Sequence, residues 1–349
     1  MNLLQRAARV AIIGYGRWGR QCHAHLIERA EGLELYGIAS GSAEKRAQIV
    51  QNHGCRAYES FEQVLADDAV DVVVLATPNA THCPLAVAAL EAGKHVVTDK
   101  VMCLSMDEFG RMSAAAQQAG RLLTVFQNRR LDGDFGTLQR AMSEGILGDV
   151  RWIEMAWQGM GMWGGWRAQA EHGGGRFYDL GAHLVDQAQL LFPQPVQSVF
   201  CRMQHDIAGL EVESQCTILI AFENSCTAVL DLSSLTAHAK PRFEARGTQA
   251  TFVKYGLDAQ EDALKAGDIE LARELPELYA KVLGHREEQV LETIPGRWRD
   301  YYENLARVLQ SGEQPIVTLA SARRTMQILD AALRSAKSGE VVRETIASA

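Results

Sequence analysis

The chain has 349 residues, which is more than one compact domain usually holds, so its length favours two domains. Its composition, 47% hydrophobic and 22% charged, is that of a folded globular protein and excludes a largely disordered or fibrous chain. The net charge of -8 argues against a nucleic-acid or anionic-membrane surface, because such surfaces need a basic patch. Small molecules and other subunits are the expected partners.

Targeting signals and cysteine spacing exclude several further classes of protein. No apolar run approaches the roughly 18 residues that cross a bilayer, and no signal-peptide cleavage pattern precedes the first expected strand, so a cytoplasmic protein is predicted. The seven cysteines are scattered without CxxC spacing, which predicts reduced structural thiols and neither a disulfide framework nor a zinc site.

The first part of the chain alternates apolar runs with helical patterns. Strands are expected at 8–16, 34–40, 70–78, 95–99 and 121–127, with helices at 18–30, 42–52, 83–92 and 106–119. Strands that are apolar throughout and separated by helices form a parallel sheet that is covered on both faces. A doubly wound α/β domain is therefore predicted over residues 1–127.

After Gln127 the pattern changes to strands that follow one another with short turns. They are expected at 149–158, 196–204, 211–223, 225–234, 241–247 and 249–254, with helices at 136–144, 179–191, 298–310 and 320–338. Glu223 and Asn224 predict a tight hairpin. Residues 128–349 are therefore predicted to form an α/β domain with an open, largely antiparallel sheet, whose uncovered face is suited to contacts between subunits.

The segment GYGRWG matches the G-x-G-x-x-G pattern of dinucleotide-binding loops. The pattern alone is weak, but here it closes an apolar strand and opens a helix. In that context Gly14 makes the tight turn, Gly16 lets the backbone approach a pyrophosphate, and Gly19 allows close packing of helix and strand. The pyrophosphate would lie at the helix N-terminus, where unpaired N–H groups favour an anion.

The residue that selects the cofactor is expected at the end of the second strand, about 20 residues past the motif. Ser40 stands there in place of the Asp or Glu of an NAD-specific protein, so no carboxylate would repel a 2′-phosphate. Hydroxyl and basic side chains that could hold such a phosphate lie nearby, namely Ser40, Ser42, Lys45, Arg46 and Arg17. NADP is therefore favoured over NAD, the alternative being a plain turn beside a solvated basic helix face.

A second group of polar residues occurs in GGGRFYDLGAHLVDQ. Asp179 and His183 are spaced i, i+4, so both lie on one face of a helix, and Asp186 shares its flank. A satisfied core pair or a surface ion pair would explain this spacing as well as catalysis does. The glycine run ahead of the helix favours catalysis. No metal is expected. A serine hydrolase is not indicated either, because the sequence has no G-x-S-x-G elbow.

The chemistry of alcohol oxidation connects this helix to Lys100 in the segment HVVTDKVM. A hydroxyl is as weak an acid as water, far weaker than a protonated histidine with a pKa of about 6.5, and the gap of about 9 units corresponds to about 12 kcal/mol. Because a base alone cannot hold the alkoxide, a cation must stabilise the oxygen while the hydride departs. Lys100 can supply that cation, His183 the base, and Asp179 the group that orients the imidazole.

Four segments together resemble the Gfo/Idh/MocA family of nicotinamide-dependent sugar and cyclitol oxidoreductases: GYGRWG, ATPNATH, AGKHVVTDKV and GGGRFYDLGAH. Within it, QNRRLDGDF and FVKYGLDAQEDALKAG are most similar to the NADP-dependent scyllo-inositol dehydrogenase group. The resemblance implies an N-terminal Rossmann domain, a C-terminal α/β domain whose open sheet mediates homodimers or homotetramers, and Lys100, Asp179 and His183 as the catalytic set.

The resemblance also implies a set of cofactor-binding positions. Thr77, Pro78, Asn79 and His82 would line the cofactor beyond the third strand, and Asn128, Arg129, Trp166 and Arg167 would approach the cofactor or the substrate, alongside Arg17, Trp18, Asp99 and Lys100. For Arg129 and Arg130 the alternative is a surface basic pair. The chain departs from the family's Glu-Lys-Pro motif with Asp99-Lys100-Val101. Either a trans bond or a strained cis bond is expected before Val101, with trans favoured because a cis bond without proline costs about 2.5 to 4 kcal/mol.

The leading hypothesis is an NADP(H)-dependent oxidoreductase that acts on a secondary alcohol or ketone of a sugar, inositol or related polyol. One alternative is a cofactor-binding sensor of the same fold that has lost catalysis, which Val101 would favour and the retained Lys100, Asp179 and His183 oppose. Another is a glycosidase that uses its bound cofactor only transiently.

Overall fold

The computed structural model describes residues 3–161, 163–238 and 240–349. The chain forms two compact units, which are described separately. The first consists of residues 1–128 and 297–322, and the second of residues 129–296 and 323–349. Residues 297–322 thus belong to the first unit although they follow most of the second in sequence.

Six parallel strands form the sheet of the first unit, in the order β3-β2-β1-β4-β5-β6. They are β1 (Ala8–Ile13), β2 (Leu33–Ala39), β3 (Arg56–Tyr58), β4 (Val72–Leu75), β5 (His95–Thr98) and β6 (Leu123–Val125). Every residue of β4 is 0% exposed, as expected for a strand covered on both faces. The predicted doubly wound sheet is confirmed. Its order reverses at β1, and such sheets bind ligands in the crevice at the carboxyl ends of the strands beside the reversal.

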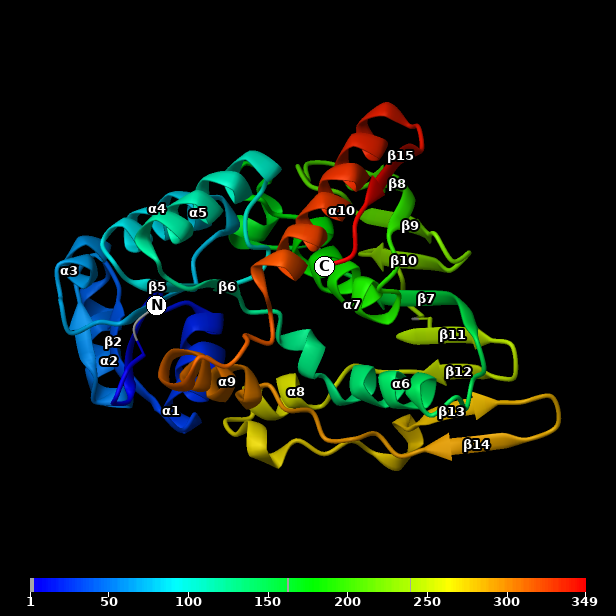
Figure 1. Ribbon diagram of the computed structural model, residues 1–349, viewed down its shortest axis with the longest axis horizontal. Coiled ribbons are helices and arrows are strands. Elements are labelled where there is room, and N and C mark those ends of the chain that lie inside the picture. Colours follow the sequence, from blue (N-terminus) through cyan, green and yellow to red (C-terminus); the bar gives the residue numbers. More distant parts are fainter. Residues whose placement is uncertain (1–2, 162, 239) are drawn as a thin grey trace. The chain divides into compact units, whose positions relative to one another are not determined.

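Helices cover both faces of this sheet. They are α1 (His25–Arg29), α2 (Ala43–His53), α3 (Phe61–Leu65), α4 (His82–Glu91), α5 (Met106–Ala119) and α9 (Arg299–Ser311). In Figure 1, α4 and α5 lie on one side of the strands, and α1 and α9 on the other. Serines begin α2 and α5, where Ser42 and Ser105 accept backbone hydrogen bonds as N-caps. β3 and α3, which the sequence did not predict, have three and five residues, too few for a periodic pattern.

The second unit contains a nine-stranded sheet in the order β14-β13-β12-β11-β7-β10-β9-β8-β15. The strands are β7 (Val150–Gln158), β8 (Val196–Gln204), β9 (Gln215–Phe222), β10 (Thr227–Ser233), β11 (Phe243–Gly247), β12 (Thr251–Lys254), β13 (Ala280–Leu283), β14 (Glu288–Leu291) and β15 (Val342–Ile346). Neighbouring strands are antiparallel except β7 and β10, so the predicted largely antiparallel sheet is confirmed. The hairpin predicted at Glu223-Asn224 joins β9 and β10, and its left-handed residue is Ser225, with φ 62°.

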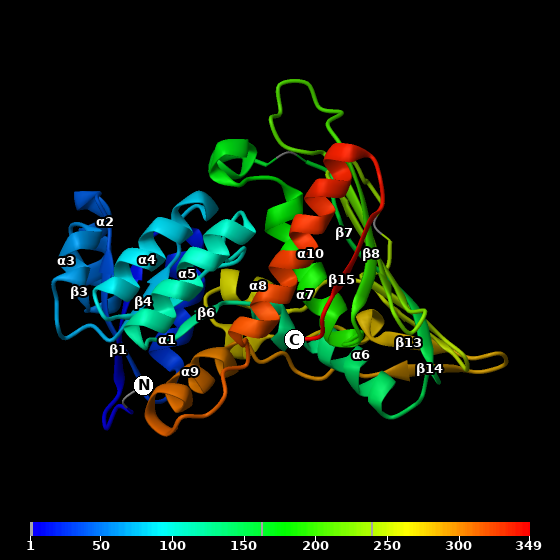
Figure 2. The same ribbon diagram turned by 45° about the horizontal axis from the view of Figure 1, so that its top comes forward.

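Helices lie on one face of the second sheet. They are α6 (Gly133–Ser143), α7 (Ala182–Leu191), the short α8 (Gln260–Lys265) and α10 (Leu319–Ser338), whose first turn is counted with the first unit. Figure 2 shows the sheet nearly edge-on with α6, α7 and α10 on the same side, and within the described ranges no helix covers the other face. β9 accordingly alternates buried with more exposed residues, as a strand covered on one face does.

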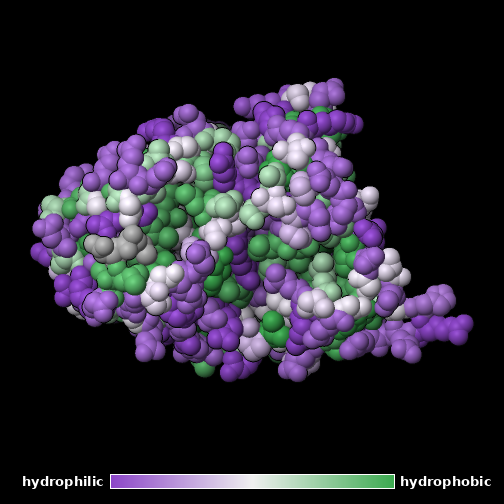
Figure 3. All heavy atoms as spheres, in the orientation of Figure 1, coloured by the Kyte–Doolittle hydropathy of each residue, from purple (hydrophilic) through white to green (hydrophobic). Residues whose placement is uncertain are grey.

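The β13–β14 hairpin is the exposed edge of the second sheet. Its tip, residues 284–289, is exposed and strongly hydrophilic (Figure 3). Lys281 on β13 pairs with Glu288 on β14 at 2.7 Å. Charged side chains of this kind discourage an edge strand from pairing with other chains. None of the helices in the described parts of the chain combines the length and apolarity that crossing a membrane requires.

Candidate active site

The glycine loop follows β1 and has the geometry that close backbone packing requires. Gly14 has φ +104°, and a Cβ there would lie 2.6 Å from the carbonyl oxygen of Ala76; a Cβ on Gly19 would lie 2.2 Å from the carbonyl oxygen of Gly14. A Cβ on Gly16 would meet nothing within 4 Å. Gly14 and Gly19 therefore serve turn and packing, whereas Gly16 presents an open backbone face that a pyrophosphate can approach.

The helix that leaves the loop begins with a wider π-helical turn, Gly19–Ala24, that continues into α1. Arg17 is exposed at its start, and the half-buried indole of Trp18 packs beside Trp298, with ring centroids 6.1 Å apart. The loop, the open backbone at Gly16 and this helix start fit a bound dinucleotide.

The end of β2 brings together the residues expected to choose the cofactor. Arg46 donates from Nη1 to the Ser40 carbonyl oxygen at 3.0 Å and from Nη2 to Glu59 Oε1 at 2.9 Å. Ser42 is exposed and caps α2 by accepting from the Lys45 amide at 3.3 Å. The guanidinium of Arg46 is thus held beside Ser40 with no Asp or Glu at the strand end itself, an arrangement that suits a 2′-phosphate.

The turn after β4 contains the expected cofactor-lining segment. Thr77 and Pro78 are half-buried, and Asn79 is buried. The Thr81 hydroxyl lies 2.7 Å from both Thr77 Oγ1 and the Pro78 carbonyl oxygen. His82 is fully buried, with Nδ1 2.8 Å from the Val101 carbonyl oxygen and Nε2 3.1 Å from the Thr77 carbonyl oxygen. Burial lowers the pKa of His82. Its imidazole therefore ties the loop after β4 to the loop after β5 and supports the site from inside.

Lys100 lies just past the end of β5 and is half-buried. The Asp99 carboxylate accepts from the Lys100 amide at 2.8 Å, which fixes the backbone at this position. The peptide bond between Lys100 and Val101 is cis, so the favoured trans alternative is wrong and the cis alternative is the one observed.

A buried row of polar side chains stands behind this loop. Tyr302 on α9 contacts His23 Nδ1 through its hydroxyl at 2.6 Å, and His23 Nε2 lies 3.7 Å from Asp99 Oδ2. Burial raises the pKa of Asp99, but His23 and the charge of Lys100 lower it more, so the net pKa lies below its usual value. Asp99 is thus a negatively charged carboxylate directly before Lys100 in the chain. No sequence pattern pointed to the contact between His23 and Tyr302, since they lie 279 residues apart.

The second group of predicted residues lies where α7 begins. Asp179 falls in the π-helical turn Phe177–Gly181, and His183 in the first turn of α7. Both are buried, at 7% and 4% exposure. Asp179 Oδ2 accepts from Arg167 Nε at 3.3 Å, and Arg167 stacks on Trp166 with its Cζ 4.5 Å from the ring centroid. The structure therefore brings Arg167 and Trp166 to the start of α7.

Asp186, on the same flank, has a structural role. It accepts a bidentate ion pair from Arg130 at 2.6 and 2.7 Å and a hydrogen bond from Thr325 at 3.1 Å. Arg129 is likewise buried, at 3% exposure, between Asp132 at 3.4 Å and Glu261. The alternative of a surface basic pair at Arg129 and Arg130 is wrong, because both guanidinium groups pair with carboxylates inside the second unit.

Asn128 is buried, at 1% exposure, and neither amide atom has a hydrogen-bond partner among the described residues. Buried amides are normally satisfied, so this side chain is the member of the expected cofactor set that most needs a ligand or a water.

The glycine run ahead of α7 is required by close packing. A Cβ on Gly175, which has φ +95°, would lie 2.5 Å from the carboxylate oxygens of Glu213, and one on Gly174 would lie 2.4 Å from the Arg167 carbonyl oxygen. Glu213 in turn accepts from the Phe177 amide at 2.5 Å. The run therefore lets Glu213 reach the backbone where the helix begins. Nothing in the sequence indicated Glu213.

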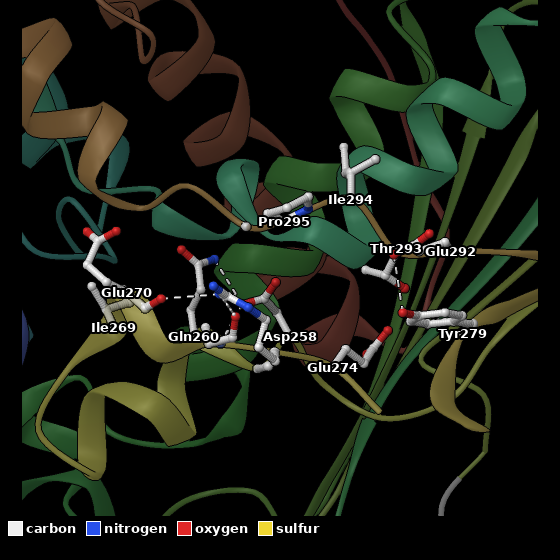
Figure 4. A pocket seen from close by; sticks show the side chains of 14 residues that line it. Asp258, Gln260, Ile269, Glu270, Glu274, Tyr279, Glu292, Thr293, Ile294 and Pro295 are labelled. Atoms are coloured by element: carbon white, nitrogen blue, oxygen red, sulfur yellow. Dashed lines mark hydrogen bonds between the residues drawn. The ribbon is translucent and has the colours of Figure 1, made fainter. Parts of the chain in front are cut away.

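The second unit also contains a cavity of about 530 Å³. Figure 4 shows Glu270 toward one end and Tyr279 with Glu292 toward the other, and the Tyr279 hydroxyl donates to Glu292 at 3.4 Å. The charged residues that line it are Asp258, Glu270, Arg273, Glu274 and Glu292. Four carboxylates against one guanidinium would repel a diphosphate, so this cavity does not suit an anionic cofactor. The described residues contain no cluster of three or more His, Cys, Asp or Glu side chains placed to hold a metal ion.

Most of the chain is similar to proteins of one family. Residues 8–127 match the oxidoreductase family with the NAD-binding Rossmann fold, and residues 135–253 match the GFO/IDH/MocA C-terminal domain. The chain is 35% identical to the uncharacterized oxidoreductase YdgJ of Escherichia coli (94% of this chain, 96% of YdgJ), and 30% identical to scyllo-inositol 2-dehydrogenase (NADP(+)) IolW of Bacillus subtilis (94% of each). Among solved structures, yvaA of Bacillus subtilis superposes with a TM-score of 0.90 at 27% identity, covering 97% of this chain and 99% of yvaA. The chain belongs to the GFO/IDH/MocA family of NAD(P)-binding oxidoreductases.

Proposed function

We propose that this oxidoreductase transfers a hydride between NADP(H) and a secondary alcohol or ketone of a sugar, inositol or related polyol. The observation that carries the proposal is the position of Lys100. It follows a Rossmann strand at the edge where such sheets bind their ligands, next to the buried ionised carboxylate of Asp99.

The first unit supports NADP as the cofactor. Gly14, Gly16 and Gly19 fit a pyrophosphate, and the Arg46 guanidinium beside Ser40 fits a 2′-phosphate. A relative that is 30% identical over most of its length is named an NADP(+)-dependent enzyme. When bound, the nicotinamide accepts or donates the hydride at the substrate carbon. Thr77, Pro78, Asn79, Asn128 and Trp18 complete the proposed cofactor-binding set.

The protein's own residues would manage the charge and the proton of the substrate oxygen. The Lys100 ammonium stabilises the negative charge that develops on that oxygen, and the His183 imidazole takes or returns the hydroxyl proton. Asp179 would orient the His183 imidazole, and Arg167 donates to the Asp179 carboxylate at 3.3 Å.

A polyol is the substrate class that the comparisons support. One relative is named a scyllo-inositol dehydrogenase, and another, 25% identical over 95% of this chain, is named D-apiose dehydrogenase. Both names denote dehydrogenases of polyhydroxylated molecules. We also propose that the uncovered face of the nine-stranded sheet mediates a homodimer or homotetramer, because an open sheet face needs a partner to bury its apolar residues.

The cofactor part is tested by thermal-shift titration with NADP+ and NAD+, since a ligand that binds only the folded state raises the melting temperature. NADP+ should give the larger shift in the wild type. In Ser40→Asp the shift with NADP+ should fall and that with NAD+ should rise, with a change in relative affinity of tenfold or more. Ser60→Asp, at another helix N-cap of the first unit, is the matched control and should leave both shifts unchanged. A larger shift with NAD+ in the wild type would contradict NADP preference.

The substrate part is tested with the preferred cofactor and a panel of inositols and aldoses, following absorbance of the reduced nicotinamide. Turnover with at least one polyol is expected. No turnover with any member, or release of product from a glycoside without net cofactor reduction, would contradict the proposed reaction.

A further inference from the structure

An indole ring lies against the imidazole that the proposed function makes the acid/base group. Trp157, near the end of β7, stacks on His183 with ring centroids 5.9 Å apart and an interplanar angle of 26°. Trp157 is half-buried and His183 is 4% exposed. A stacked ring restricts the rotation of an imidazole about its side-chain bonds, because any other rotamer loses the contact.

The indole is itself held by two buried guanidinium groups. The Cζ atoms of Arg129 and Arg242 lie 4.8 and 4.7 Å from the centroid of the Trp157 ring. The two arginines are 3% and 2% exposed. Cation–π contacts are stronger when they are shielded from water, so together they oppose movement of the ring. Arg242 reaches it because β11 pairs with β7, and its carbonyl oxygen accepts from the Ala156 amide at 3.1 Å.

One side chain of α7, that of Gln187, forms hydrogen bonds with both arginines. Gln187 on α7 is fully buried and follows His183 by one helical turn. Its Nε2 donates to the Arg129 carbonyl oxygen at 2.9 Å, and its Oε1 accepts from Arg242 Nη2 at 3.0 Å. The ring, the two guanidinium groups and the helix that carries His183 therefore form one closed network, and the helix cannot rotate without breaking buried hydrogen bonds.

We propose that Trp157 is a positioning residue for His183, held in place by Arg129, Arg242 and Gln187. Its indole fixes the imidazole in the orientation needed for proton transfer. The inference rests on the proposed function, since it assigns a role only if His183 moves the substrate proton. It also gives Arg129 a task inside the second unit, in place of the contact with cofactor or substrate that its sequence motif implied.

The kinetic test compares Trp157→Leu, Trp157→Phe and the matched control Trp152→Leu. Trp152 lies on the same strand, is also half-buried and also contacts a guanidinium, that of Arg246 at 5.6 Å. Because a misplacement of about 1 Å can cost on the order of 10²-fold in rate, Trp157→Leu should lower kcat at least tenfold while the KM for NADP(H) stays within twofold. Trp157→Phe should recover most of that loss, and Trp152→Leu should leave kcat unchanged. Wild-type kcat in Trp157→Leu, or an equal loss in Trp152→Leu, would overturn the proposal.

A spectroscopic test does not depend on turnover. Since a protonated imidazole quenches a stacked indole, the difference in emission between the wild type and Trp157→Phe should change with pH, and His183→Asn should abolish that change. A pH-dependent difference that survives in His183→Asn would overturn the stacking role. If His183→Asn retains full activity, the proposed acid/base assignment fails instead, whatever the emission shows. If His183→Asn is inactive and Trp157→Leu is not impaired, the positioning role alone fails.

Discussion

Lys100 in the first unit and His183 in the second are held in different ways. Lys100 is placed mainly by backbone: it follows a strand whose register in a parallel sheet is fixed, and its amide is bonded by the adjacent Asp99 at 2.8 Å. His183 lies in the first turn of α7, and the ring of Trp157, from another part of the chain, stacks on it. A cation that stabilises an oxygen needs only to lie near it, and backbone placement is enough for that. A base that transfers a proton needs a set orientation, which a stacked ring can provide.

The ionisable groups buried in the two units differ as well. In the first unit, burial keeps the histidine His95 neutral, and in the second unit burial keeps the carboxyl group of Asp134 neutral to unusually high pH. Acidification should therefore weaken the first unit and, over part of the same pH range, strengthen the second.

Lys100→Met should reduce kcat by about 10² to 10³-fold, the usual cost of removing one group that stabilises a developing oxyanion. The KM for NADP(H) and the thermal shift on NADP+ binding should change little, because the pyrophosphate and 2′-phosphate contacts proposed for the cofactor do not involve this lysine. Lys281→Met, which removes an exposed lysine from the β13–β14 hairpin, is the control and should retain activity. A wild-type kcat in Lys100→Met would contradict the proposed role of Lys100 at the substrate oxygen.

His95 should make the first unit sensitive to acid. Burial lowers its pKa from 6.5 to about 4, and its Nδ1 accepts from the Leu122 amide at 2.9 Å, which requires the neutral ring. The folded state thus disfavours the proton, so the stabilisation is present above about pH 6.5 and is lost as pH falls toward 4, by up to about 3 kcal/mol. In His95→Asn, which keeps an acceptor without a titrating ring, the free energy of unfolding from urea titrations should lose this dependence. The exposed His285→Asn should keep it, and a His95→Asn profile parallel to the wild type would contradict the assignment.

Asp134 should act in the opposite direction in the second unit. Burial, together with the nearby charge of Asp258, raises its pKa from 3.8 to about 6. The folded state binds the proton more tightly than the unfolded state does, so its contribution is complete below about pH 4 and is lost as pH rises to about 6, by on the order of 3 kcal/mol. Asp134→Asn should remove this slope from the unfolding free energy measured between pH 4 and 6, and the exposed Asp149→Asn should not. A slope that Asp134→Asn leaves unchanged would show that this carboxyl group titrates normally.

The sequence predicted most of what depends on periodicity and strand ends. Apolar runs and helical spacing found the parallel sheet and its long helices, and the motif spacing found Gly14, Lys100 and His183, because each stands at a fixed place relative to a strand or helix terminus. It missed the three-residue β3, the four-residue β13 and the mostly exposed β14, which are too short or too polar for a clear apolar pattern. It also did not reveal that the Arg129 guanidinium pairs with Asp132 and Glu261.

The supporting residues of the site escaped sequence analysis for a common physical reason. His23 meets Tyr302, and Trp157 meets His183, across large separations in sequence, and no spacing rule relates such residues. Glu213 likewise contacts the glycines ahead of α7 from another part of the chain. Such contacts can be found only from the tertiary packing, or from a buried polar side chain that needs a partner.

In the proposed reaction the chain removes hydride from a polyol carbon, with Lys100 at the oxygen and His183 at the proton. The most direct measurement is the rate of NADPH formation from an accepted polyol that carries deuterium or hydrogen at the reacting carbon, in the wild type, Lys100→Met and His183→Asn. The wild type should show a normal primary isotope effect, and both variants should form NADPH at least 100-fold more slowly while still binding NADP+. NADPH formation at the wild-type rate in either variant, or no NADPH from any polyol, would contradict the claim.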